Sequence, residues 1–412
     1  MMTMTGLAAR NVFRNRRRSI LNMIAISIGV ALMFVCLGWV QGYETYIYST
    51  VIRFQTGSAQ LLHEGYEEEA ARLPLDLVLP EYPQVRSRLL ATPGISGASG
   101  RIDFLARLIT PAGSVRLLGQ GIDAEAERDV TILSRKIVRG SYLDGQPGLL
   151  LGSGIAGKLG VEPGSVVFVS ATDKYGVENR TALPVRGIFS FGYGAMDDGI
   201  VYLDLPSAQY LLDLDDEVTR IVLAGPGGDR VRAAASGFVD GLGEGYPPTK
   251  AYGWQEFAKA TVSGVRTDTY SFYVVAVILF GLIIVGILNS MSMSVHERTR
   301  ELSTLRAIGF RRRDAKRLIL LESLILAAIG TATGLLVAAP VAVWLGIYGV
   351  DIAGSIPKDF PVPFGEMYHA DYRPWHALVS IALGIGACLA GSIIPARRVA
   401  RLPIAETIGG GM

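Results

Sequence analysis

One segment of the sequence combines glycines and a lysine in the spacing of a phosphate-binding loop. Residues Gly152 to Leu159 read Gly-Ser-Gly-Ile-Ala-Gly-Lys-Leu, which satisfies both G-x-G-x-x-G and G-x-x-x-x-G-K. The apolar run Leu149–Leu151 precedes the segment. A helix that starts after such a strand would direct backbone N–H groups at a phosphate. The first chemistry to consider is therefore nucleotide binding.

Other features of the same region argue against a nucleotide site. Leu159 stands where a Ser or Thr hydroxyl would bind magnesium. No acidic residue follows about 20 positions later in a β-α-β frame, as a dinucleotide-binding fold requires. Ile200–Asp204 imitates a magnesium-binding strand end, but aspartates are common in turns. We therefore favour a structural role for these residues.

Other catalytic or metal chemistry has no support in the sequence. It contains no G-x-S-x-G or H-E-x-x-H motif, and its four histidines are scattered. Its two cysteines, Cys36 and Cys388, lie inside apolar runs, where a thiol usually serves as a small buried hydrophobe. We expect no catalytic residue, no metal site and no cofactor bound by this chain.

The composition indicates a membrane protein. Half of the 412 residues are hydrophobic and 18% are charged, and the mean hydropathy is +0.35. Soluble domains usually have about a quarter of their residues charged. Runs of about 20 apolar residues can cross a bilayer. Four such spans are predicted, at residues 19–41, 271–293, 318–346 and 375–395.

Two details of these spans need an interpretation. The first span is too long for the apolar region of a signal peptide and lacks an A-x-A cleavage site, so we expect an uncleaved anchor. Glu322 is the one acidic residue within the predicted spans. It lies close to the start of its span, where we expect it to be paired near the interface.

The charges predict the orientation of the chain. Segments 1–18, 294–317 and 396–412 hold 16 basic and four acidic residues. Residues 42–270 hold 21 basic and 28 acidic residues, a net charge of −7, and residues 347–374 are also net acidic. By the positive-inside rule both termini are cytoplasmic and the two acidic segments are periplasmic. The loop at Gly152 then lies on the side where ATP is scarce.

Residues 42–270 are expected to form a mixed α/β domain. Strands are predicted from β-branched and aromatic residues bounded by Gly, Pro or Asp, at Val166–Ser170, Ala182–Phe189, Gly199–Leu205 and Val218–Ala224. Helices are predicted at Tyr82–Ala91 and Pro206–Leu212. Tyr43–Phe54 and Trp254–Asp268 are expected to extend the first two spans as a helical stalk. The fold class is thus an α-helical membrane protein with a large α/β periplasmic domain.

The cytoplasmic loop 294–317 has the pattern of a short amphipathic helix. Leu302, Leu305 and Ile308 recur at helical spacing among charged residues, and Gly309 ends the run. A short helix between two spans cannot bury its apolar stripe by itself. The pattern alone leaves two alternatives, a helix on the lipid surface and a helix docked into a groove of a partner.

Several motifs resemble those of the FtsX/MacB-type permease family of ABC transporters. The segment Glu297–Phe310 resembles that family's coupling helix, and Arg10–Arg18 and Pro395–Glu406 resemble its two ends. The outside segments resemble the lipoprotein-releasing (Lol-type) permeases more than the macrolide exporters; these are Gly121–Glu127, Ile137–Gly140 and Leu149–Gly164. The resemblance extends over nearly the whole chain.

The resemblance implies a permease subunit that is not an enzyme by itself. Two copies, or this chain and a paralogue, are expected to pair with a cytoplasmic dimer of ATPase subunits, which would bind ATP and Mg²⁺. The expected ATPase contacts are Glu297, Arg298, Arg300, Glu301, Leu305, Arg306 and Gly309. Gly330 and Gly334 form a G-x-x-x-G that would let two helices approach closely. Membrane lipid is a further expected partner, and no nucleic acid is expected.

The sequence leaves the cargo open. The first hypothesis is release of lipoproteins toward the outer membrane, with a periplasmic carrier. The second is efflux of a peptide or drug through a periplasmic adaptor. A third is a mechanotransmitter that activates a cell-wall hydrolase without transport, and a fourth is a membrane-anchored binding protein without an ATPase. The outside surface has no motif that selects among them.

Overall fold

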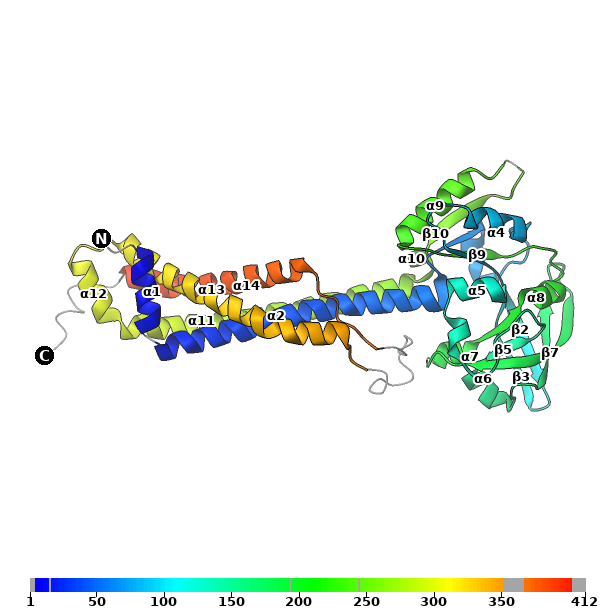
Figure 1. Cartoon of the computed structure of the whole chain (residues 1–412), viewed down its shortest axis with the longest axis horizontal. Coiled ribbons are helices and arrows are strands. Elements are labelled where there is room, and N and C mark those ends of the chain that lie inside the picture. The colour runs from blue at the N-terminus through cyan, green and yellow to red at the C-terminus, as the bar shows by residue number, and fades with distance from the viewer. Residues whose placement is uncertain (1–3, 15, 193, 244, 352–366, 402–412) are drawn as a thin grey trace. The chain divides into compact units, whose positions relative to one another are not determined.

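The apolar runs form four long helices in the computed structural model, which describes residues 4–14, 16–192, 194–243, 245–351 and 367–401 (Figure 1). These helices are α2 (Arg16–Val51), α11 (Lys259–Glu297), α13 (Arg312–Ile347) and α14 (Pro374–Arg401). Each contains a window long and apolar enough to cross a bilayer. The predicted fold class, with one span before the large domain and three after it, is confirmed.

The chain divides into two units, and the division falls within α2 and α11. The membrane unit comprises Met1–Tyr46, Val265–Val350 and Met367–Met412. The second unit comprises Ile47–Gly264 and Asp351–Glu366. Residues 352–366 of the predicted loop 347–374 and residues 402–412 of the predicted C-terminal segment lie outside the described residues. The segment Pro395–Glu406 is therefore described only as far as residue 401.

Two short helices complete the membrane unit. Helix α1 (Met4–Arg14) buries Ala8 and Val12 in the same apolar cluster as α13. Helix α12 (Thr299–Ala307) connects α11 to α13. Figure 1 shows α1 and α12 at the same end of the four long helices. The amphipathic pattern predicted α12, whereas residues 1–18 were expected only as a basic cytoplasmic segment, so α1 was missed.

The second unit is built on one sheet of ten strands. Six of them are β1 (Ala59–His63), β2 (Gly97–Thr110), β3 (Gly113–Ile122), β4 (Ile137–Gly140), β5 (Leu149–Gly152) and β6 (Val166–Thr172). The others are β7 (Glu178–Phe189), β8 (Ile200–Asp204), β9 (Arg220–Ala224) and β10 (Thr249–Gly253). The four strands predicted from the sequence are β6 to β9, with ends shifted by a few residues.

The strand order divides this sheet into a closed ring and an extension. Following the pairs from β2 through β3, β8, β5, β7 and β6 leads back to β2, so six strands close on themselves. The first residues of β2 pair instead with β9, which pairs with β1 and then β10. The 14-residue β2 thereby belongs to both parts. Because β2 is shared, the two parts are joined by continuous backbone hydrogen bonding.

Helices cover the sheet and supply the rest of its core. They are α3 (Tyr66–Glu69), α4 (Tyr82–Leu90), α5 (Ala124–Val130), α6 (Ser153–Leu159), α7 (Gly194–Gly199), α8 (Leu205–Leu212), α9 (Gly228–Asp240) and α10 (Trp254–Phe257). Short turns of other helix types are η1 (Ile52–Thr56), η2 (Ala70–Arg72) and η3 (Leu133–Lys136). Val85, Ile155, Leu211 and Val231, from α4, α6, α8 and α9, are buried in the main apolar cluster. The predicted helices Tyr82–Ala91 and Pro206–Leu212 correspond to α4 and α8.

Candidate functional site

The segment expected to act as the coupling helix, Glu297–Phe310 (called the coupling segment below), contains the short helix α12 between two spans. A turn at Arg298 separates the end of α11 from α12, and Gly309 separates α12 from α13. Gly309 has a φ of 109°, a conformation that favours glycine. The next amide, that of Phe310, donates to the carbonyl of Leu305 at 3.1 Å. This geometry gives Gly309 a role in reversing the chain after α12.

The inner face of α12 is buried within the chain. Leu302 and Ser303 are 1% and 0% exposed, and Leu302 belongs to the apolar cluster shared with α13. Because these contacts fix one face of the helix, α12 is held on the bundle by its own side chains. The predicted apolar stripe is therefore divided, and Leu302 does not face a partner.

Arg298 is used inside the chain. Its Nη1 donates to Oε1 and Oε2 of Glu322 at 3.1 and 3.0 Å, and both side chains are more than 90% buried. The amide of Asn11 donates to the same carboxylate at 2.6 Å. Glu322 is paired, as the sequence predicted, and its partner comes from the coupling segment. The expectation that Arg298 contacts an ATPase is revised, because its guanidinium is enclosed and already bonded.

Glu301 is half exposed and also bonded within the chain. Its carboxylate accepts a hydrogen bond from Arg14 at 2.5 Å and one from Arg298 at 3.3 Å. Partial burial alone would raise the pKa of Glu301, but these two guanidinium groups lower it below its ordinary value. The contact with Arg14 joins α1 to α12, so Glu301 stabilises the coupling segment even where its outer side reaches solvent.

The outer face of the coupling segment presents different side chains. Glu297 and Arg300 are exposed, and Leu305 and Arg306 are half-buried. Ile308 is 77% exposed, one residue beyond the end of α12. Leu305 and Ile308 both belong to the apolar spacing seen in the sequence, and the structure leaves Ile308 the more exposed of the two. This difference depends on where α12 ends, which the sequence pattern does not give.

Gly330 and Gly334 lie where α13 meets α2. A Cβ on Gly334 would lie 2.6 Å from the carbonyl oxygen of Ser27, and a Cβ on Gly330 would lie 2.9 Å from the Cβ of Ile26. The Ser27 hydroxyl donates to the carbonyl of Gly330 at 2.9 Å. The two helices therefore approach so closely that any side chain at these positions requires the backbones to separate.

We expect Gly334→Ala to weaken the packing of α13 on α2. Overpacking of this kind costs about 1–3 kcal/mol, since the nearest atoms belong to the backbone of Ser27. The matched control is Gly386→Ala in α14, where an added Cβ meets nothing within 4 Å. Thermal unfolding in mild detergent should show a lower midpoint for Gly334→Ala and no decrease for the control. Equal unfolding midpoints for Gly334→Ala and Gly386→Ala would contradict a packing role for Gly334.

Of the segments expected to extend the first two spans, α2 continues as far as Val51 and α11 begins at Lys259, whereas Trp254–Phe257 form the separate helix α10. In the membrane unit, Tyr43 Oη donates to Asp268 at 2.7 Å and Thr269 Oγ1 donates to Glu44 at 2.9 Å. In the second unit, the end of α2 packs on α10, where Val51 and Trp254 are buried in one cluster. Both ends of the helix pair are thus held by direct contacts between the segment after the first span and the segment before the second.

A buried ion pair ties the end of the stalk to the sheet of the second unit. Helix α2 ends in η1, a turn with π-type hydrogen bonds. Arg101 of β2 donates to the carbonyl of Gln55 in that turn at 2.7 Å. The same guanidinium pairs with Glu127 of α5, and both side chains are at most 4% exposed. The turn after α2 is therefore joined to β2 and α5 by buried, hydrogen-bonded groups.

The segment that resembles a phosphate loop does form a strand followed directly by a helix, but acidic residues of α7 lie against it. A Cβ on Gly152 would lie 2.1 Å from the carbonyl oxygen of Asp197. Lys158 pairs with Asp198 at 2.8 Å. The Asp197 carboxylate accepts hydrogen bonds from the Phe191 amide and the Ser190 hydroxyl, each at 2.8 Å. The glycines thus allow close packing against α7, and a phosphate there would meet two carboxylates.

The described chain combines four candidate membrane spans with an α/β domain after the first span and a short helix after the second. Family models assign this arrangement to the transporter permeases. The description "FtsX-like permease C-terminal" matches residues 273–404, and "MacB-like periplasmic core domain" matches residues 19–239, more than half of the chain. The chain belongs to the FtsX/MacB-type family of ABC transporter permeases, near its Lol branch, and is a protein of the inner membrane.

Two curated relatives and one solved structure are similar to this chain. The lipoprotein-releasing system transmembrane protein LolE of Haemophilus influenzae is 22% identical over 93% of this chain and 92% of its own length. A macrolide export ATP-binding/permease protein MacB of Chlorobium luteolum is 23% identical over 83% of this chain and 52% of its own length. The periplasmic region of MacB from Actinobacillus actinomycetemcomitans aligns with 52% of this chain at a TM-score of 0.38, covering 94% of that structure.

Proposed function

We propose that this chain couples ATP hydrolysis by a separate cytoplasmic ATPase dimer to movement of its periplasmic domain. The ATPase subunits bind ATP and Mg²⁺, and the permease acts as a pair, with a second copy or a paralogue. Both termini and α12 are cytoplasmic in this proposal, in agreement with the 16 basic residues of these segments. The second unit is then periplasmic.

The observation that carries the proposal is the exposed Ile308 beside a helix whose other face is fixed. A force on Ile308 passes into α12, because Leu302 and Ser303 are buried in the bundle. From there Arg298 passes it to Glu322 in α13, and Glu301 passes it to Arg14 in α1. The proposed ATPase contacts are Glu297, Arg300, Leu305, Arg306 and Ile308.

The periplasmic end of the proposed coupling is the stalk. A displacement of α2 and α11 relative to each other changes the position of η1, and Arg101 connects that turn to β2 and Glu127. Since β2 belongs to both parts of the sheet, a change at its first residues reaches the closed ring as well. The described parts of the four spans are almost entirely apolar, so they offer no polar path for a hydrophilic cargo. The proposal therefore does not include passage of such a cargo across the bilayer.

We propose lipoproteins, or another lipid-anchored cargo, as the transported class. Support comes from the lipoprotein-releasing relative, to which this chain is similar over 92% of that relative's length. A soluble periplasmic carrier is then needed, since an acyl chain released into water must be shielded. The alternative is efflux through a periplasmic adaptor, and the next experiment distinguishes it from lipoprotein release.

The test is purification of the full chain from native membranes in mild detergent, with mass spectrometry of the bound proteins. The proposal predicts an ATPase together with acylated proteins. An ATPase with a periplasmic adaptor or a cell-wall hydrolase would keep the permease and overturn the cargo. Absence of any ATPase would overturn the coupling function and leave a membrane-anchored binding protein.

A further inference from the structure

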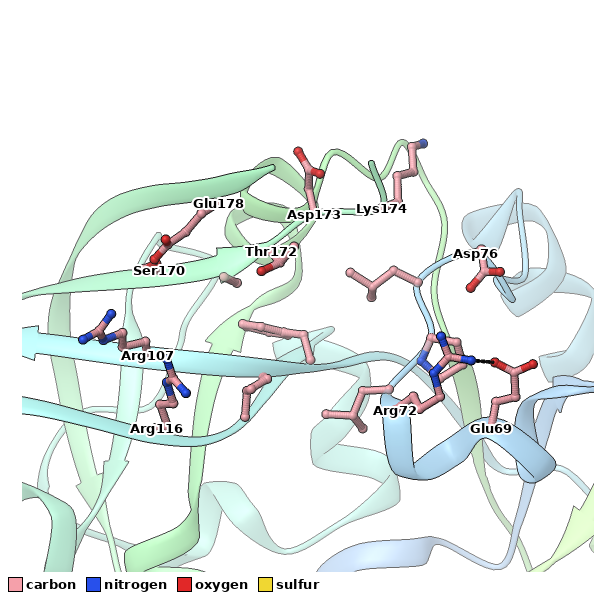
Figure 2. A pocket seen from close by; sticks show the side chains of 16 residues that line it. Glu69, Arg72, Asp76, Arg107, Arg116, Ser170, Thr172, Asp173, Lys174 and Glu178 are labelled. Carbon is pink, nitrogen blue, oxygen red and sulfur yellow. Dashed lines mark hydrogen bonds and ion pairs between the residues drawn. The ribbon is translucent and has the colours of Figure 1, made fainter. Parts of the chain in front are cut away.

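A polar cavity of about 800 Å³ lies in the second unit, away from the stalk contacts (Figure 2). Strands β2, β3 and β6 form one wall, and η2 with the residues after it forms another. This volume is within the range of small-molecule sites, about 300–1,000 Å³. The lining residues include four acids and four bases, so the pairing of these charges decides what the cavity can bind.

Most charged groups of the cavity have partners. Arg72 pairs with Glu69 at 3.0 Å, and Lys174 pairs with Glu217 at 3.4 Å. The Asp173 carboxylate accepts from the amides of the turn that follows it. Of the charged residues that line the cavity, Arg107, Arg116 and Asp76 have side chains that make no ion pair or hydrogen bond with the described part of the chain. Figure 2 shows the two arginines on one side of the cavity and Asp76 on the other.

The two arginines are adjacent on one face of the sheet. Arg107 of β2 and Arg116 of β3 are directly opposed in the antiparallel register. Like charges directly opposite each other destabilise a sheet unless a counter-charge lies between them. Arg180 of β7 belongs to the same row, because Arg107 is paired with Ser170 and Ser170 with Arg180. The row is therefore a concentrated positive charge.

The nearest acid does not neutralise this row. Glu178 accepts a hydrogen bond from Ser170 at 2.5 Å. That hydrogen bond, and after it the positive charges of Arg107, Arg180 and Arg116, lower the pKa of the Glu178 carboxyl below its ordinary value. One carboxylate thus faces three guanidinium groups, and the surplus charge is positive.

Apolar side chains also line this polar cavity. Leu105 lies two residues before Arg107 on the same face of β2 and is 58% exposed. Leu73 and Leu75 line the opposite wall. Leu73 has a φ of 51°, a left-handed conformation that is unfavourable for leucine and is held by the surrounding structure. A cluster of positive charge that could bind an anion therefore lies next to leucine side chains.

We propose that this cavity binds an amphiphilic anion, with a phosphate or carboxylate head on Arg107 and Arg116 and an apolar tail against Leu105, Leu73 and Leu75. A guanidinium group binds either head through two parallel charge-assisted hydrogen bonds. Two opposed arginines can both bind such a head group, and the negative charge of the head group offsets their mutual repulsion. The leucines select an anion with a hydrocarbon tail over inorganic phosphate.

The test is calorimetric titration of the full chain in phosphatidylcholine nanodiscs with four water-soluble probes. These are inorganic phosphate, hexyl phosphate, octanoate and hexanol, and empty nanodiscs correct for partition into lipid. Hexyl phosphate or octanoate should bind at least about tenfold more tightly than inorganic phosphate and hexanol. Tighter binding of hexyl phosphate assigns a phosphate head, and tighter binding of octanoate a carboxylate head. If inorganic phosphate binds as tightly as hexyl phosphate and octanoate, the proposal that the cavity prefers an amphiphilic anion is wrong.

Variants separate the cavity from general attraction to positive charge. Arg107→Gln and Arg116→Gln should each weaken binding of the preferred probe by about tenfold or more. Arg180→Gln is the matched control, since Arg180 is exposed in the same row but does not line the cavity. Leu105→Ser should reduce the preference for the tailed anion and leave inorganic phosphate unchanged. Equal losses in all three arginine variants would overturn the site. The titration contains no ATPase, so failure here leaves the coupling proposal unaffected.

Discussion

Ile308→Asp is expected to abolish most of the stimulation of ATP hydrolysis by this chain. An exposed isoleucine that enters a partner's pocket contributes about 1.5–3 kcal/mol, and a carboxylate in the same pocket adds a desolvation penalty. We therefore expect the stimulated rate of the reconstituted complex to fall by at least about tenfold. Because Ile308 is 77% exposed within the chain, the thermal unfolding of the permease alone should not change.

Two further substitutions at this position make the result specific. Ile308→Val keeps most of the apolar surface and should retain stimulation. Ile308→Trp distinguishes the two environments that the sequence left open. A tryptophan suits a lipid interface but overfills a pocket shaped for isoleucine, so we expect it to reduce stimulation. Full stimulation by the Trp variant would place the coupling segment on lipid and contradict the partner contact.

Arg298→Met is expected to destabilise the membrane unit strongly. Removing one partner of a buried ion pair costs about 3–5 kcal/mol, because the other charge stays buried without compensation. Here the carboxylate of Glu322 would retain only the amide of Asn11 among the partners described. Thermal unfolding in mild detergent should show a decrease well beyond that of the control Arg300→Met, whose side chain is exposed.

The double variant Arg298→Met/Glu322→Met decides between an internal and a partner role for Arg298. Replacing a buried pair by apolar residues of similar size is often neutral or stabilising, so the double variant should regain stability. If Arg298 acts only within the chain, the double variant should also regain stimulation of ATP hydrolysis. Stability without stimulation would return Arg298 to the set of ATPase contacts.

Glu301 is a poor position at which to test a partner contact by mutation. Its carboxylate holds Arg14 and Arg298, so a charge reversal there disturbs α1 and α12 before it reaches any partner. Leu305 presents a similar difficulty, since it is half-buried. Ile308 is the better probe because its side chain contributes little to the folded chain. Ile308 is thus the most informative position. The sequence shows that it belongs to the apolar pattern, but only the structure shows that it is exposed.

Much of the architecture follows from local sequence signals. Four apolar runs predict four helices because each must satisfy its backbone hydrogen bonds internally in lipid. Alternating or β-branched segments predict β6 to β9, since each carries enough of its own pattern. Helix α1 was missed because it is short and because the burial of Ala8 and Val12 depends on packing with the other helices of the membrane unit. Its existence is a tertiary effect.

The sequence by itself determined the membrane class, the number of spans, the charge asymmetry and the motifs of the family, because these depend on composition and short-range pattern. Only the tertiary structure decided which charges are used internally. Arg298 and Arg300 are two residues apart and chemically identical, yet one is enclosed with Glu322 and the other faces outward. The opposition of Arg107 and Arg116 likewise depends on the register of β2 with β3. Burial and pairing are properties of distant segments brought together, which no local pattern encodes.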